Sequence, residues 1–370
     1  MRKELHRLVF SVTSHCNLHC KYCYVLNNQT KHFIPKTMTP EIIQKAIRKL
    51  FNSYSVIKFI QFFGGEPNLA LPSMRIAVNE IRKICTTQKL PYPQFGIVTN
   101  LTILNEEILS FYKDNSLKVT VSLDGPENIH NFLRACPSGS GTQDKVVQNL
   151  KQLHDKGIPF DVECTFTKLH IEKGITVVNL LEYFDRIGAA RADIVGVMAK
   201  PDSELYVYGE TLPQLIELFV EAVDYWFDYW RRGGKTVFGI VAECLAMISS
   251  SPKGNYCTAG ESNLAVAPDG KIYPCHLFID DNDCVIGSVE DTLPLHLSGF
   301  KNFFKNNTSC HNCPINTICF SCLGRNKFYS GNLSQPFAGD CLLKYKLISR
   351  ILEHLGEGIL PENWTTSSNG

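Results

Sequence analysis

Three cysteines near the amino terminus have the types and spacing that most clearly predict chemistry. Cys16, Cys20 and Cys23 follow the pattern C-x3-C-x2-C, directly after a short apolar run. Three thiolates on one loop can bind three irons of a 4Fe–4S cluster and leave the fourth iron without a protein ligand. Such an iron can chelate a small molecule. The alternative is a zinc site that recruits His15 or His19, although zinc prefers four ligands in two separated pairs.

A glycine-rich turn follows the second apolar run of the chain and reads Gly64-Gly65-Glu66-Pro67. Two glycines let a backbone pass close to a ligand. The exposed carbonyls of such a turn can accept hydrogen bonds from an ammonium group. We therefore predict a ligand contact at this turn.

A third candidate lies where the run 117–124 ends. Ser122 and Asp124 share one face of the expected strand, because side chains alternate along a strand. Polar groups at the carboxyl end of a barrel strand could contact a ribose or a carboxylate. A plain turn is the alternative for Asp124, because Gly125 and Pro126 follow it.

A second group of cysteines lies in the last third of the chain. Its pattern is C-x12-G-x4-C, then C-x2-C-x5-C-x2-C, then one more cysteine, formed by Cys257, Gly270, Cys275, Cys310, Cys313, Cys319, Cys322 and Cys341. Two C-x2-C pairs also suit a zinc ribbon, which is the alternative here. Fifteen cysteines without an export signal favour metal binding over disulfides. We expect a cytoplasmic, oxygen-sensitive protein.

Alternating β-rich and helical patterns must position these residues. The six predicted strands are 7–13, 57–64, 95–100, 117–124, 160–167 and 193–198. The first intervening helix has Thr39 as its N-cap, and the last opens at Thr211. Six β–α repeats imply a parallel sheet with right-handed crossovers, but they cannot close an eight-stranded barrel. The predicted fold is α/β, a partial (β/α)6 TIM-like barrel followed by a small cysteine-rich iron–sulfur domain.

The texture of the sequence changes after about residue 235, where cysteine, glycine and asparagine dominate, and a helical pattern returns at 342–355. We predict a barrel domain over 1–234, an auxiliary domain over 235–345, and a helix with a flexible tail over 346–370. The 370 residues are 44% apolar with a net charge of +1, so a sizeable core is available. Nothing predicts a nucleic-acid or membrane partner.

The cysteine loop, the GGEP turn and the third motif, in this order, resemble those of radical S-adenosylmethionine (SAM) enzymes. The resemblance implies that the open iron binds the amino and carboxylate groups of the methionine moiety. An electron from the cluster then cleaves the sulfonium and releases a 5′-deoxyadenosyl radical. The cofactor contacts that it implies or favours are Tyr22 near the adenine, Gly64, Gly65, Glu66 and Pro67 at the amino group, Ser122, Asp124, and Arg134 at the carboxylate.

One motif departs from the family. Relatives commonly have Thr-Asn-Gly at the end of the third strand, where this chain has Thr99, Asn100 and Leu101. We therefore expect the loop to follow a different path and leave open a role for Asn100.

The carboxy-terminal cysteines resemble the SPASM domain, which carries two auxiliary iron–sulfur clusters. The resemblance implies that one cluster is ligated by Cys310, Cys313, Cys319 and Cys341, and the other by Cys257, Cys275 and Cys322. The fourth ligand of the latter could be Cys284 or Cys244, or a substrate thiol could bind there. The last internal spacing is two residues rather than three, which departs from the family at Cys322. Cys85 and Cys164 lie in apolar patterns and are expected in the core.

Two acids are candidate catalytic residues. In the run 160–167, Glu163 lies on the polar parity, and a desolvated carboxylate beside the radical could remove a proton during oxidation. Glu243 could supply the acid that sulfatase maturases carry in a Phe-Asp-x-x-Leu stretch, which this chain lacks. The alternative for both is a structural or solvated acid. Tyr206 and Tyr208 could contact an extended peptide or form a surface loop.

SPASM-containing relatives mostly modify peptides or proteins, so we expect an oxidoreductase of that kind. The favoured hypothesis is a maturase of ribosomally made precursor peptides, with a separate leader-recognition protein as partner and flavodoxin or ferredoxin as reductant. An anaerobic sulfatase maturase, which converts cysteine or serine to formylglycine, is the first alternative; the absence of a leader-binding domain before the first strand favours it. A non-catalytic iron–sulfur electron carrier is the second.

Overall fold

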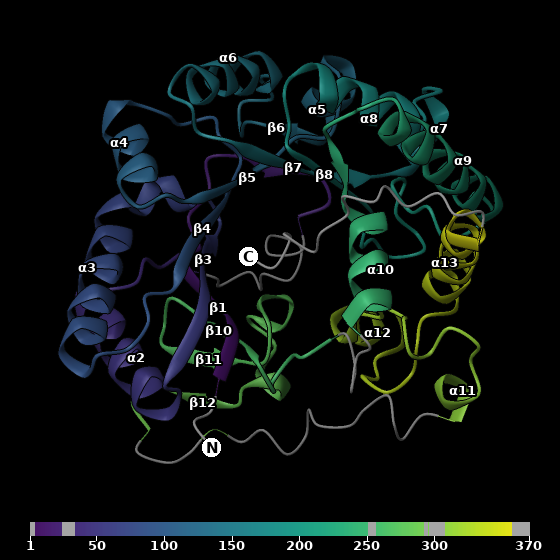
Figure 1. Cartoon of the computed structure of the whole chain (residues 1–370). Helices are drawn as coiled ribbons and strands as arrows, with labels where there is room; N and C mark the ends of the chain where they lie inside the picture. Colours follow the sequence, from purple (N-terminus) through teal and green to yellow (C-terminus); the bar gives the residue numbers. More distant parts are fainter. Residues whose placement is uncertain (1–3, 24–33, 251–256, 292–294, 296–307, 357–370) are drawn as a thin grey trace. The chain divides into compact units, whose positions relative to one another are not determined.

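We analysed a computed structural model that describes residues 4–23, 34–250, 257–291, 295 and 308–356 (Figure 1). The chain divides into two compact units, each built from separate stretches of sequence. The first contains Met1–Ser122, Arg134–Pro159 and Thr258–Lys301, and the second contains Leu123–Leu133, Phe160–Cys257 and Asn302–Gly370.

The first unit is built on a seven-stranded run of sheet in the order β12-β11-β10-β1-β3-β4-β5. Its strands are β1 (Glu4–Thr13), β3 (Val56–Gly64), β4 (Gln94–Thr99), β5 (Lys118–Ser122), β10 (Asn263–Val266), β11 (Lys271–Tyr273) and β12 (Gly287–Ser288). The pairs that join β10, β1, β3, β4 and β5 are parallel, and β11 and β12 are added antiparallel. A separate two-stranded ladder joins β2 (His19–Cys20) to β6 (Arg134–Ala135).

Helices cover one face of this sheet (Figure 1). They are α2 (Pro40–Ser53), α3 (Leu71–Gln88), α4 (Glu106–Asp114) and α6 (Gln143–Asp155). The unit also contains the short 3-10 turns η1 (Pro67–Ala70), η2 (His276–Phe278) and η3 (Asn282–Cys284). Phe62 of β3 stacks on Phe95 of β4, with ring centroids 6.1 Å apart, and also faces Phe111 of α4. The core of the first unit therefore lies between the strands and these helices.

The second unit contains the parallel strands β7 (Phe160–Phe166), β8 (Arg191–Gly196) and β9 (Val237–Phe238). Its helices are α5 (Glu127–Leu133), α7 (Lys168–Glu172), α8 (Val177–Arg186), α9 (Leu212–Arg231), α10 (Gly239–Ser250), α11 (Thr308–His311), α12 (Leu323–Ser330) and α13 (Ala338–Gly356). Asp224 fixes α13 against α9, since Arg350 Nε and His354 Nε2 each lie 2.6 Å from its Oδ1.

Most predicted elements agree closely with the structure. Each predicted strand overlaps an observed one, and the Thr39 side chain caps α2 by accepting from Ile42 N. α9 begins after Thr211, although the Thr211 side chain makes no capping bond. α13 is longer than the predicted 342–355 helix, and the predicted tail lies outside the described residues. The mixed α/β fold with a largely parallel sheet and a cysteine-rich carboxy-terminal region is confirmed, consistent with a partial TIM-like barrel.

The sequence predicts that a separate auxiliary domain begins at residue 235, but one strand beyond that residue belongs to the first unit. β10 follows that position by almost thirty residues, yet it pairs with β1 through Arg7–Asn263 to Phe10–Val266 and belongs to the first unit. A four-residue apolar strand carries too little periodicity to be seen in a sequence of short turns. The boundaries at 234 and 345 stay a prediction. No described helix has the length and apolar character needed to span a membrane.

Candidate metal centre and cofactor site

The loop that carries Cys16, Cys20 and Cys23 leaves the end of β1 and is fixed at two points. Cys20 lies opposite Arg134 in the β2–β6 ladder, and Cys23 N donates to Cys20 O at 3.1 Å. Leu18 N donates to Cys16 Sγ at 3.4 Å. An N–H group aimed at sulfur favours the thiolate form that a metal requires. The backbone thus presents the three thiols from one short, hydrogen-bonded segment.

The Gly64-Gly65 turn packs directly against this loop. Gly65 N donates to Thr13 O and Glu66 N donates to His15 O, both at 2.8 Å. A Cβ atom on Gly65 would lie 2.2 Å from His15 O, and one on Gly64 would lie 2.0 Å from Thr13 O. Gly64 also has a φ of +140°, which favours glycine. The glycines are required by this close backbone approach, and the turn positions the residue next to Cys16.

The carboxylate of Glu66 is fully buried and joins the end of β3 to the end of β4. It accepts hydrogen bonds from Asn68 N at 3.0 Å, Thr99 Oγ1 at 2.7 Å and Asn100 N at 2.7 Å. Burial raises the pKa of Glu66 to about 7, although these hydrogen bonds lower it. The side chain is committed to the protein interior, so the predicted cofactor contact falls to the backbone of the turn.

Leu101 stands where relatives commonly have glycine, and its backbone adopts a conformation that favours glycine; the expected difference in loop path stays a prediction. Leu101 is fully buried and adopts a φ of +53°, a conformation that costs a residue with a Cβ roughly 1–2 kcal/mol. Asn149 Nδ2 donates to Leu101 O at 2.8 Å and helps to hold it. Asn100 consequently reaches the cysteine loop, where its Nδ2 donates to Asn17 Oδ1 at 3.0 Å and lies 4.0 Å from Cys16 Sγ. Sequence patterns alone gave no signal for Asn17.

Tyr22 and Arg134, two predicted cofactor contacts, lie together. The Arg134 guanidinium stacks 5.2 Å from the centre of the Tyr22 ring. Burial raises the pKa of Cys16 to about 11, whereas the Leu18 N–H and the charge of Arg134 lower it. The three predicted features, cysteine loop, aromatic ring and cation, are therefore brought to one place within the first unit.

Ser122 and Asp124 occupy different surroundings. Ser122 ends β5 in the first unit and is half-buried. Asp124 belongs to the second unit and is fully buried, where its Oδ1 accepts from Thr165 N at 2.9 Å. His170 Nε2 lies 2.9 Å from Asp124 O. These contacts hold Asp124 within the second unit, and its role as a cofactor contact stays a prediction.

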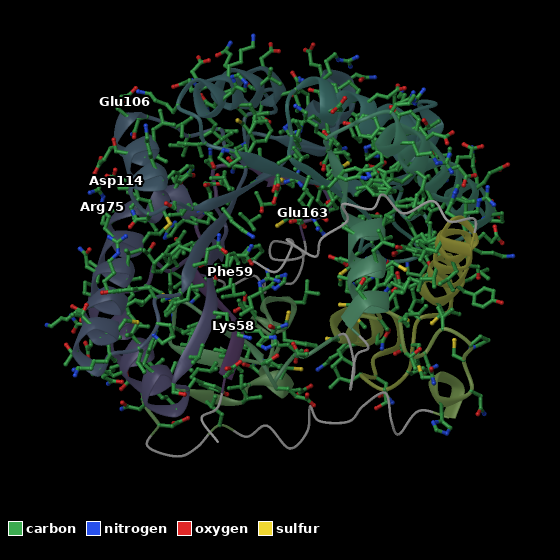
Figure 2. All side chains as sticks on the ribbon, viewed as in Figure 1. Lys58, Phe59, Arg75, Glu106, Asp114 and Glu163 are labelled. Atoms are coloured by element: carbon green, nitrogen blue, oxygen red, sulfur yellow. The ribbon has the colours of Figure 1, made fainter. Side chains whose placement is uncertain are left out.

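The predicted parity of β7 is observed. Phe160, Val162 and Phe166 are buried, and Glu163 is half-buried on the opposite face of the strand, away from α8 (Figure 2). Register places Glu163 opposite Asp193 of β8.

Glu243 on α10 is engaged by a cation that the sequence analysis did not single out. Arg191 Nη2 lies 3.3 Å from Glu243 Oε1 and 2.8 Å from Asp193 Oδ1. Burial alone would lower the pKa of Arg191, but the charges of Asp193, Glu243 and Asp161 outweigh burial, so the pKa is raised. Arg191 therefore stays charged, and Glu243 serves an ion pair in this structure.

The two tyrosines of the 200–210 loop differ in burial: Tyr208 is buried and Tyr206 is half-buried. Tyr208 is 6% exposed, contacts the guanidinium of Arg325 with its hydroxyl, and packs against Tyr329 and Phe337. Arg325 Nη1 also donates to Gly196 O at 2.9 Å. Tyr208 fastens α12 to the end of β8 and is not available to a peptide, while Tyr206 is half-buried beside it.

The four cysteines predicted for one auxiliary cluster come within electrostatic range of each other. Burial raises the pKa of Cys310, and the neighbouring Cys319 and Cys313 raise it further. Burial also raises the pKa of Cys341, to about 11, with contributions from Asp340, Cys319 and Cys310. Burial raises the pKa of Cys319, and the Lys344 ammonium, 2.5 Å from Asp340 Oδ2, offsets part of that rise. A buried cation beside four thiols suits an anionic cluster.

The second predicted cysteine set is divided between the units. Cys275 belongs to the first unit, where its Sγ lies 3.3 Å from His276 Nδ1, and Cys257 and Cys322 belong to the second. Of the possible fourth ligands, Cys244 lies near Cys319, in the neighbourhood of the first set, and Cys284 contacts Asp281 Oδ2 at 3.6 Å. The ligand assignment stays a prediction.

Across the described parts of the chain, no three His, Cys, Asp or Glu side chains converge tightly enough to hold a single metal ion. A 4Fe–4S cluster binds each cysteine to a different iron and needs no such convergence. The thiols of the amino-terminal loop have an N–H group beside them, and those of the set with Cys319 have a cation beside them; both sets suit iron–sulfur clusters.

Comparison with known proteins agrees with this chemistry. A family model for the Radical SAM superfamily matches residues 10–186. The cysteine-type anaerobic sulfatase-maturating enzyme of Clostridium novyi (strain NT) is 25% identical, covering 88% of this chain and 89% of that protein. The uncharacterized protein MJ0907 of Methanocaldococcus jannaschii is 33% identical, covering 80% of this chain and 92% of its own length.

Two solved structures show the same fold. The structure of anSMEcpe with bound AdoMet has a TM-score of 0.81 at 19% identity and covers 97% of this chain and 96% of its own. Streptococcus suis SuiB bound to S-adenosylmethionine has a TM-score of 0.65 at 16% identity, covering 92% of this chain and 77% of its own.

Proposed function

This chain belongs to the radical SAM superfamily, and we propose that it modifies a ribosomally made precursor peptide by abstracting a hydrogen atom from it. The family uses a 4Fe–4S cluster and SAM, which together supply a 5′-deoxyadenosyl radical. One observation carries the proposal: the loop of Cys16, Cys20 and Cys23 is held by the Gly64-Gly65 turn.

We assign the following roles to residues of the first unit. Cys16, Cys20 and Cys23 hold the cluster, and the backbone of residues 64–67 orients the amino group of the cofactor. Arg134 is a cation suited to the carboxylate of the cofactor, and Tyr22 offers a ring beside the adenine. Ser122, half-buried at the carboxyl end of β5, is suited to a further polar contact.

The remaining predicted residues are proposed to serve the auxiliary clusters and the substrate. Cys310, Cys313, Cys319 and Cys341 would hold one cluster, while Cys257, Cys275 and Cys322 would contribute to the other. Glu163 is the favoured candidate for a proton acceptor, because it is half-buried on the polar face of β7. Glu243 is the second candidate, and its ion pair with Arg191 stabilises the charged form of the carboxylate.

The peptide substrate is favoured by the state of Glu243. A sulfatase maturase needs an acid before the auxiliary domain, and the residue that could substitute for it is occupied by a buried guanidinium. Relatives that act on peptides support the class, since SuiB has been solved bound to precursor peptide SuiA. A separate leader-recognition protein and a low-potential flavodoxin or ferredoxin are the proposed partners.

Sulfatase maturation is the second candidate. Proteins with that name match over most of this chain, and anSMEcpe has also been solved with bound AdoMet and a cysteine peptide. Under this alternative the product is formylglycine. A synthetic peptide that spans the target cysteine or serine of a sulfatase would lose mass in the expected step, whereas a precursor peptide would be left unchanged.

The shared chemistry is tested by cofactor cleavage. Anaerobically reconstituted protein, given dithionite and SAM, is expected to form 5′-deoxyadenosine, and Cys20→Ala is expected to reduce this at least a hundredfold because the cluster loses a ligand. Cys85→Ala is the matched control, since Cys85 is a buried core thiol 3.6 Å from Pro91 O. Cleavage at the wild-type rate by Cys20→Ala would refute the assignment. If neither wild type nor any variant cleaves SAM, the hypothesis of a non-catalytic iron–sulfur electron carrier is supported instead.

A further inference from the structure

Arg7 is placed on the face of the first unit's sheet that its helices do not cover. β1 is an inner strand of this sheet, between β10 and β3. Because side chains alternate, Arg7 shares a face with Phe59, Gln61 and Phe63 of β3, while Phe62 on the opposite face packs under α4. Figure 2 shows Phe59 on the side of the strands away from α3.

The guanidinium of Arg7 has no acidic partner among the described residues. Its Nη2 donates to the neutral amide oxygen of Gln61, and its Nε is buried without any hydrogen-bond acceptor. Two other partly buried arginines have an acidic partner. Arg191 is paired with Asp193, and Arg325 lies 3.4 Å from Asp340.

An uncompensated charge in such a place is costly. Removing a guanidinium from water without a partner is unfavourable by several kcal/mol in general, so such charges are normally paired. Arg7 is half-buried, and the part of its side chain that is withdrawn from water includes a donor that nothing in the described chain satisfies. An anion at this place would accept from Arg7 Nε and neutralise the guanidinium.

The surroundings of Arg7 have the composition of a ligand site. Phe59 and Phe63 are half-buried aromatic side chains on the same face, and Phe59 lies over Gly96, where a Cβ would come within 2.4 Å of its ring. Phe63 packs against His276 with centroids 4.9 Å apart. A few convergent polar groups among apolar walls are typical of small-ligand and peptide pockets.

We propose that Arg7, with Gln61 beside it, binds a carboxylate of the substrate peptide, so that the enzyme selects a peptide with an acidic side chain or a free carboxyl terminus near the reacting residue. Arginine suits this role because its planar fork binds a carboxylate through two parallel hydrogen bonds. The inference rests on the proposed peptide substrate, and it names the chemistry that the peptide must present.

The test compares two capped tetrapeptides, acetyl-Ala-Phe-Glu-Ala-amide and acetyl-Ala-Phe-Gln-Ala-amide, by saturation-transfer NMR on the anaerobic holoenzyme. Wild-type protein is expected to bind the glutamate peptide at least tenfold more tightly at low salt. Arg7→Gln should abolish this preference and Arg7→Lys should retain part of it. Lys58→Gln is the matched control, because Lys58 is an exposed cation of the neighbouring strand on the opposite face, paired with Glu4.

Several outcomes separate the inference from the proposed function. Equal binding of both peptides by wild-type protein overturns the inference, while SAM cleavage can still stand. A loss of preference in Lys58→Gln equal to that in Arg7→Gln overturns it as well, since any surface cation would then suffice. Arg7→Gln could instead change the reduction potential of an auxiliary cluster and leave the affinity for both peptides unchanged. The anion beside Arg7 would then be the cluster near Cys275, and the inference would be wrong. Iron content equal to wild type in Arg7→Gln verifies that the variant is folded.

Discussion

At the scale of single residues, the carboxylate of Glu66 makes the folding stability of the protein depend on pH. Its pKa of about 7 in the folded protein lies above the value near 4.5 expected in the unfolded chain, because burial outweighs three hydrogen bonds. Folding is then favoured by the neutral form. The stabilisation is fully present below pH 4.5 and is lost as pH rises through 7, by about 3 kcal/mol at roughly 1.4 kcal/mol per pKa unit.

Glu66→Gln tests this directly. The glutamine cannot ionise, so the free energy of unfolding of wild type minus that of the variant is expected to fall by about 3 kcal/mol between pH 4.5 and pH 8. Anaerobic denaturant unfolding at fixed iron content measures it. Because the amide also loses the acceptor for Asn100 N, the variant should be less stable at acidic pH. Parallel pH profiles for the two proteins would show that Glu66 has an ordinary pKa.

At the scale of elements, the close contact between the β3–η1 turn and the cysteine loop yields a second prediction. Gly65→Ala would place a methyl group 2.2 Å from His15 O, and a backbone carbonyl cannot move aside without moving Cys16. We expect iron incorporation into the first cluster and SAM affinity to fall at least tenfold. Gly356→Ala is the control, because a Cβ there meets no atom within 4 Å. Iron content and equilibrium binding of SAM measure both.

A wild-type iron content in Gly65→Ala would show that the loop adjusts without cost, and that the glycine is present for the ligand alone. The same variant with normal iron but weak SAM binding would assign Gly65 to the cofactor contact. The two readouts therefore distinguish the positioning role from direct contact.

The elements also show what a sequence can and cannot predict here. Hydrophobic alternation and caps predicted six strands and the first helix to within a few residues, because these signals are local. The β1–β10 pairing joins residues more than 250 positions apart, and no local pattern encodes it. The conformation of Leu101 could not be predicted for another reason: buried packing and the bond from Asn149 hold a left-handed conformation that the residue type disfavours.

The candidate site likewise has features that a local pattern predicts and features that depend on long-range contacts. Thiol spacing is a local signal, because the chemistry needs a fixed donor set on one loop, and the ligand roles that it indicates stay predictions. The partners of each ligand came from the structure alone. No sequence spacing predicts the contact of Asn17 with Asn100 or of Arg191 with Glu243, because tertiary packing brings each pair together.

At the scale of the whole molecule, the cysteine sets lie on separately packed parts of the chain. Cys16, Cys20 and Cys23 are held by strands of the first unit, and Cys310, Cys313, Cys319 and Cys341 are held by α11–α13 and their connections in the second. Each unit has its own buried core, so loss of one metal centre need not unfold the other. Independence of the two centres is a prediction that a single substitution can test.

Cys313→Ala is expected to remove one auxiliary cluster and spare the first. Iron and sulfide should fall by about four per chain, and 5′-deoxyadenosine formation without peptide should stay within about threefold of wild type, since about 0.7 kcal/mol is the scale of an indirect effect. Formation of modified peptide should stop, because removal of electrons from the substrate radical needs an acceptor. Cys164→Ala, a core thiol of β7, is the control for lost packing. Full product formation by Cys313→Ala would exclude the cluster from turnover, and loss of 5′-deoxyadenosine as well would show that the two units depend on each other.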